Sequence, residues 1–238
     1  MGCDVDFYLL KRDVLVAKFI ELEKNDDDYI FFKNYLIEKN IIEGNTYSKT
    51  DANILIQKIK RDTLLLKRDE LYYIRSYIFE VSVGIKKYGY IPEDKRFVKK
   101  MKQFGFELIH EISHGCASLF LLSLGDSESV DYSSWNYDER DRMNLKKEEF
   151  LRELDYIILL HSKIQLRECD DLDKKNELIG TINNLEKNEL LKNIVESHFD
   201  TAMEDEKLMN NSWTILFNAR ELTKKVETVE DGIIILDS

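Results

Sequence analysis

This sequence contains few of the residues that interrupt regular secondary structure. Its 238 residues include one proline and nine glycines, together about 4% of the chain against about 12% in an average protein. The shortage excludes collagen-like, proline-rich and Gly/Ser-linker architectures and argues against a sandwich with many tight turns. Apolar residues make up 43% and charged residues 34%, which is enough for a core, so we expect a mainly α-helical protein.

The sequence is also poor in cysteine, in long apolar segments and in positive charge. Three cysteines with no C-x-x-C pair predict free thiols in a reducing cytosol rather than a disulfide framework. The most apolar run, residues 116–124, is too short to span a bilayer, and no cationic leader is visible, so we expect a cytoplasmic protein with no membrane association. The net charge is −11. Because phosphate binding needs Lys and Arg, this charge argues against direct nucleic-acid binding and suits a protein or peptide partner with a basic surface.

Apolar residues recur at helical spacing along most of the chain. Helices are predicted over residues 13–24, 26–39, 51–66, 69–90, 93–124 (bent or broken at Gly105), 145–167, 172–185, 190–203 and 213–226. Segment 69–90 also alternates like a strand, but its periodicity favours a helix. Residues 233–236 predict a short strand that could pair with residues 7–10 and so join the two termini in a small two-stranded sheet. With an irregular loop over 125–144 and no repeat or linker, we expect a single helical domain spanning 1–238.

One short motif carries a chemical signal. Residues 110–114 read His-Glu-Ile-Ser-His, an H-E-x-x-H pattern. On a helix, His110 and His114 would lie on one face and could bind one zinc ion, and Glu111 could then act as general base on the metal-bound water.

Residues 108–115 resemble the active-site helix of zincin metallopeptidases, most closely gluzincins of the neprilysin type. The resemblance covers about eight residues and implies a zinc-dependent hydrolase, with a third ligand from a glutamate further along the chain. Glu139 is the preferred third ligand, and Glu128, Glu148 and Glu149 are alternatives. The histidine that metzincins place after the motif is absent, and no edge strand for a peptide substrate is evident.

Two further features complete the candidate sites. The aromatic residues Tyr132, Trp135 and Tyr137 of the irregular loop could form a partner-binding surface or a lid on the core. His161 is isolated on an amphipathic segment and is expected to be a packing or surface residue. The rival to the zinc enzyme is therefore a non-enzymatic acidic binding protein of immunity or inhibitor type, whose partner is a toxin, a nuclease or another nucleic-acid-binding protein.

Overall fold

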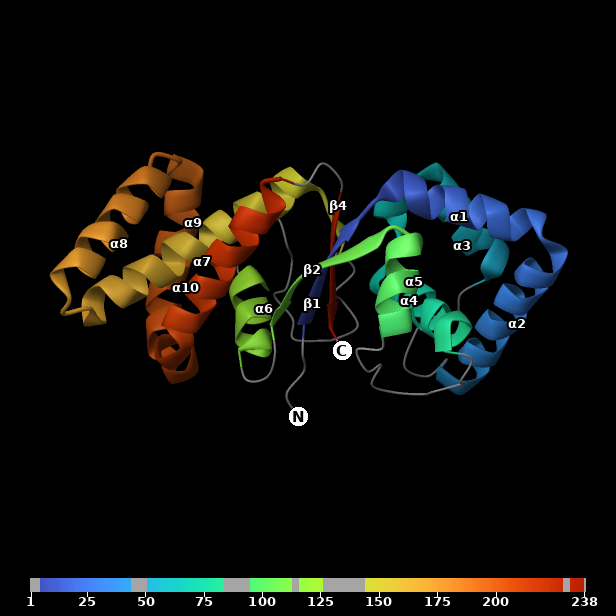
Figure 1. The fold of residues 1–238 in the computed structure, drawn as a ribbon. Helices are drawn as coiled ribbons and strands as arrows, with labels where there is room; N and C mark the ends of the chain where they lie inside the picture. Colours follow the sequence, from blue (N-terminus) through green and yellow to red (C-terminus); the bar gives the residue numbers. More distant parts are fainter. Residues whose placement is uncertain are drawn as a thin grey trace. The chain divides into compact units, whose positions relative to one another are not determined.

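The computed structural model describes residues 5–43, 51–83, 95–112, 116–125, 144–228 and 232–237 (Figure 1). Its helices are α1 (Arg12–Lys24), α2 (Asp26–Glu43), α3 (Ala52–Arg61), the 3-10 turn η1 (Thr63–Leu65), α4 (Arg68–Val83), α5 (Lys95–Gln103), α6 (Ala117–Gly125), α7 (Lys147–Glu168), α8 (Leu172–Leu185), α9 (Glu189–Glu204) and α10 (Glu206–Val226). The strands are β1 (Val5–Leu10), β2 (Phe106–Ile112), β3 (Asn144–Leu145) and β4 (Gly232–Asp237). The fold is mainly α-helical, as the sequence predicted.

The four described strands form one sheet in the order β2-β1-β4-β3. β3 pairs antiparallel with β4, with Asn144 opposite Ile234 and Leu145 opposite Ile233. β1 and β4 are hydrogen-bonded neighbours, so the predicted pairing of the segments near the two termini is confirmed. β2 was not predicted as a strand.

The chain divides into two compact units. Unit 1 contains Met1–Val5, His110–Arg140 and Lys147–Val229, and unit 2 contains Asp6–Ile109, Asp141–Lys146 and Glu230–Ser238. A domain is a part that could fold alone, and compactness by itself does not establish this property. The single domain expected over residues 1–238 therefore stays a prediction.

Unit 1 is built around α7, the longest described helix. α7 packs most extensively against α10 and also contacts α6, α8 and α9, and Figure 1 shows α7 and α10 running alongside each other. Leu154, Ile157 and Ile164 of α7 are fully buried, because they recur at the spacing that places them on the core side of the helix. Asp171, Asn188 and Asp205 cap the first turns of α8, α9 and α10 with their side-chain oxygens.

Unit 2 has an aromatic core between α1, α2, α4 and the end of α5. The rings of Phe19, Phe32, Tyr77 and Phe104 form a closed circuit of edge-to-face pairs, with centroids 4.7 to 6.4 Å apart. Such pairs contribute about 0.5–1.5 kcal/mol beyond the burial of their surface. This core packs against α2, the helix whose exposed side is described below.

Within the helical region predicted over residues 93–124 the break at Gly105 is confirmed, but residues 106–112 form a strand rather than a helix. Within the described part of that segment, α5 ends at Gln103, β2 occupies Phe106–Ile112, and α6 begins at Ala117. Gly105 causes the break, because its φ of 90° lies in the left-handed region and a Cβ there would come 2.6 Å from the Lys11 carbonyl oxygen. The Gly105 carbonyl in turn accepts a hydrogen bond of 2.8 Å from the Lys11 amide.

Candidate functional site

His110 and Glu111 lie on β2, a strand, rather than on the helix that the zincin resemblance implies. Successive side chains of a strand point to opposite faces, so Glu111 leaves the backbone on the side away from His110. The helix predicted for residues 110–112 is therefore wrong, while the zinc site stays a prediction.

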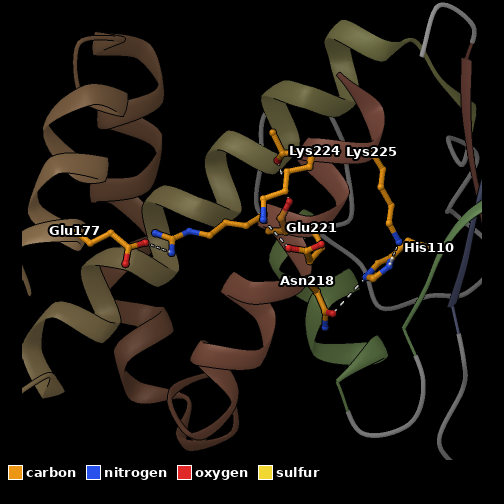
Figure 2. Close-up of polar contacts among 9 residues, drawn as sticks. His110, Glu177, Asn218, Glu221, Lys224 and Lys225 are labelled. Carbon is orange, nitrogen blue, oxygen red and sulfur yellow. Dashed lines mark hydrogen bonds and ion pairs between the residues drawn. The ribbon is translucent and has the colours of Figure 1, made fainter. Parts of the chain in front are cut away.

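The imidazole of His110 is held by two side chains of α10 (Figure 2). Its Nδ1 lies 3.2 Å from the Nζ of Lys225, and its Nε2 lies 3.4 Å from the Oδ1 of Asn218. The Lys225 ammonium can only donate, so Nδ1 accepts and Nε2–H donates to the Asn218 amide oxygen. Both ring nitrogens thus have protein partners, and a metal ion could bind either one only by displacing Asn218 or Lys225.

The electrostatic surroundings of His110 favour its neutral form. Half-burial, followed by the Lys225 charge, lowers the pKa of His110 below its usual value, and Asn218 and Glu221 oppose this shift. The pKa of Glu221 is lowered mainly by its hydrogen bond with Lys224, 2.8 Å away. An ammonium beside the imidazole disfavours a divalent cation at the same place, because the two positive charges repel.

Several other residues of the predicted zinc and partner sites lie outside the described residues: His114, Glu128, Glu139, Tyr132, Trp135 and Tyr137. The alternative third ligands Glu148 and Glu149 lie in the first turn of α7. Among the residues that the structure does describe, no group of three or more His, Cys, Asp and Glu side chains could hold a metal ion. The zinc site and the aromatic loop surface stay predictions.

His161 is a core residue of unit 1. It is fully buried on α7, with Nε2 2.8 Å from the Ser123 Oγ of α6 and Nδ1 3.0 Å from the Ser212 Oγ of α10. The Ser212 hydroxyl donates its one proton to the Leu208 carbonyl at 2.7 Å, so it accepts from Nδ1–H, and Nε2 accepts from Ser123. Burial lowers the pKa of His161 to about 3. This histidine links three helices as a neutral group.

An acidic and apolar face on α2 was not identified from the sequence, which predicted only a helix there. We call this the α2 face: Asp26, Asp27, Ile30 and Ile37. At 100° per residue Asp26, Ile30 and Ile37 fall within about 40° of one another, and the two isoleucines are 53% and 47% exposed. Asp26 and Asp27 are exposed and form no ion pair within the described part of the chain, whereas Asp28 lies 200° from Asp26, on the side of Tyr35. The opposite side of α2 carries the buried residues Phe32, Tyr35, Leu36 and Lys39.

No protein-family model, curated protein or solved structure matches this chain. None of the described helices combines the length and the apolar character needed to cross a lipid bilayer. The functional proposal that follows therefore rests on the chain's own residues.

Proposed function

We propose that this chain is a non-enzymatic acidic binding protein of immunity or inhibitor type, acting in the cytoplasm on a partner with a basic surface. A toxin, a nuclease or another nucleic-acid-binding protein has such a surface. The observation that carries the proposal is the α2 face, where two exposed aspartates adjoin two exposed isoleucines.

The chemistry of the α2 face fits a partner in which Lys or Arg residues surround an apolar patch. Single exposed apolar residues are ordinary on protein surfaces. Ile30 and Ile37 differ in sharing one side of a helix with Asp26, so one partner could cover all three. The isoleucines would supply burial at about 25 cal/mol per Å². The aspartates would steer a basic partner and align it, an effect that weakens as salt is added.

The alternative from the sequence, a zinc-dependent hydrolase, has less support. It requires His110 and Glu111 on a helix with a free imidazole nitrogen, whereas they lie on β2 and the imidazole contacts Lys225 and Asn218. The net charge of −11 has no role in that mechanism and has a direct one in binding a basic partner.

The test is affinity capture followed by calorimetry. The purified chain, immobilised on resin, is exposed to a lysate of its source cells at about 0.05 M salt and washed at about 0.5 M salt. The proteins released are then purified and titrated against the free chain. We expect a basic protein whose affinity falls at least tenfold between the two salt concentrations.

Matched charge-reversal variants distinguish a specific role of the α2 face from a general effect of negative charge. The double variant Asp26→Lys/Asp27→Lys reverses two exposed charges in the first turn of α2, and Asp173→Lys/Glu189→Lys does the same in the first turns of α8 and α9. Both pairs incur the same unfavourable interaction with the helix dipole. We expect only the first to weaken binding. Equal losses would mean that net charge alone acts, and an acidic or salt-insensitive partner would refute the proposal.

A further inference from the structure

The outward side of α10 carries four exposed residues in one line, which we call the α10 stripe: Glu206, Trp213, Phe217 and Lys224. At 100° per residue they fall within about 40° of one another. Trp213 is 44% exposed and Phe217 is 61% exposed, large values for aromatic rings at adjacent turns of a helix. The inward side of α10 carries the buried residues Leu208, Ser212, Ile215, Leu216, Ala219, Leu222 and Val226. The aromatic pair thus takes no part in the core of unit 1.

The α10 stripe is complementary to a second copy of itself that runs in the opposite direction. Trp213 and Phe217 lie two residues on either side of position 215, and Glu206 and Lys224 lie nine residues on either side of it. A two-fold axis through position 215 would place a second α10 antiparallel to the first. It would bring each Trp213 onto the Phe217 of the other copy, and each Glu206 onto the other Lys224, about 13 Å from the axis.

We infer that two copies of this chain associate through the α10 stripe as an antiparallel, two-fold symmetric helix pair. Two-fold interfaces require one surface to match itself, and the stripe meets this condition in both apolar character and charge. The inference is independent of the proposed function, whose surface is the α2 face of unit 2.

The local contacts of the stripe are compatible with this pairing. The Nζ of Lys174, on α8, lies 5.4 Å from the centroid of the Trp213 ring. The ring is still 44% exposed, so it retains surface for a second contact. A second cation of α10, the Arg220 guanidinium, donates to Glu177 of α8 at 2.6 Å, so it is directed toward α8.

The charged residues at the two ends of the stripe, Glu206 and Lys224, can form new ion pairs with a second copy. Lys224 contacts Glu221 at 2.8 Å in the same helix, and its own side chain is 70% exposed. An exposed pair of this kind contributes little and is readily exchanged for another carboxylate. Glu206 is exposed in the first turn of α10 and forms no ion pair within the described residues. A helix contact about 27 Å long buries an area at the lower end of specific interfaces, so we expect reversible dimers in the micromolar range.

The test is analytical ultracentrifugation of the full chain from about 1 to 300 µM, with charge-reversal variants. Glu206→Lys and Lys224→Glu each place like charges at both ends of the symmetric pair, and we expect at least a tenfold weaker dimer in each. The double variant Glu206→Lys/Lys224→Glu should restore it. An equimolar mixture of the two single variants should also restore it, because every end contact in the mixed dimer again joins opposite charges.

Controls separate the interface from effects on folding. Glu189→Lys reverses an exposed charge in the first turn of α9 and should leave dimerisation unchanged. Trp213→Ala should abolish dimerisation while the helical circular dichroism stays that of the wild type. A wild-type chain that is monomeric over the whole range, single reversals without effect, or no heterodimer in the mixture would each overturn the inference.

Discussion

The buried histidine of unit 1 predicts a specific dependence of stability on pH. His161 is neutral in the folded chain, with a pKa of about 3 against the ordinary 6.5, because burial disfavours its charged form. Below pH 6.5 the His161 imidazole is protonated in the unfolded chain, whereas in the folded chain it stays neutral down to about pH 3. The stabilisation is therefore complete above pH 6.5 and is lost at about 1.4 kcal/mol per pH unit as the pH falls toward 3, about 5 kcal/mol in all.

A second buried group of α7 acts in the opposite direction. Glu153 is fully buried, and burial raises its pKa to about 8 from 4.5. Its protonated form is favoured in the fold, so its stabilisation is complete below pH 4.5 and is lost as the pH rises through 8. Between pH 4.5 and 6.5 the contributions of His161 and Glu153 cancel. Within that pH range the wild-type chain alone would hide both contributions, so each is measured as a difference from a variant.

The assay is urea unfolding followed by the fluorescence of Trp213 in a Trp135→Phe background. His161→Gln keeps a polar side chain at the site and removes its titration. The stability difference between wild type and this variant should grow in favour of the wild type by about 3 kcal/mol from pH 4.5 to 6.5 and then stay constant. Glu153→Gln should show the reverse trend from pH 4.5 to 8. A difference that does not vary with pH would refute the account of the buried groups.

Two further predictions concern the backbone and the His110 contacts. Gly105→Ala should lower the free energy of unfolding by about 1–3 kcal/mol, because Gly105 has a positive φ and a Cβ there would meet the Lys11 carbonyl. The control Gly180→Ala should raise the free energy of unfolding by about 0.4–1 kcal/mol, because the space around its Cβ position is open. Lys225→Met should raise the pKa of His110, since the ammonium holds it down. An NMR titration of the His110 ring measures this shift, and an unchanged or lower value would contradict the contact.

The helices of unit 1 could be predicted because their sequence signals are local. α8 begins and ends at the predicted residues, and α7 and α9 agree within two residues. α10 begins at Glu206 rather than 213. The first turns of α10 were not predicted because the polar run Asn210-Asn211-Ser212 interrupts the apolar pattern, although Asp205 caps the helix.

The motif segment could not be assigned from the sequence for a geometric reason. Residues four positions apart share a face in an α-helix and also in a β-strand, so the spacing of His110 and His114, or of Leu108 and Ile112, fits both. What decides between them is β1, which lies beside β2 in the sheet and about one hundred residues earlier in the chain. A strand pairing between segments so far apart in the sequence cannot be read from the local residue pattern. The partners of His110, Asn218 and Lys225, are equally distant.

The α2 face and the α10 stripe were missed for a different reason. The sequence predicts helices at both places, and α2 and α10 confirm them; the side chain that caps α2 is that of Asn25, not an aspartate. Which apolar residues stay exposed depends on what packs against the helix. Ile30 and Phe217 became identifiable as surface residues only when the opposite sides of α2 and α10 were seen to be buried.

The central claim is that His110, which contacts Asn218 and Lys225, is not a zinc ligand and that the chain acts by binding a partner. The measurement that tests it most directly is the zinc content of the chain, purified without chelator, loaded with zinc and dialysed against zinc-free buffer. The account predicts far less than one zinc per chain, and no change in the His110→Ala or His114→Ala variants. About one zinc per chain, lost in both variants, would contradict it and restore the metal site.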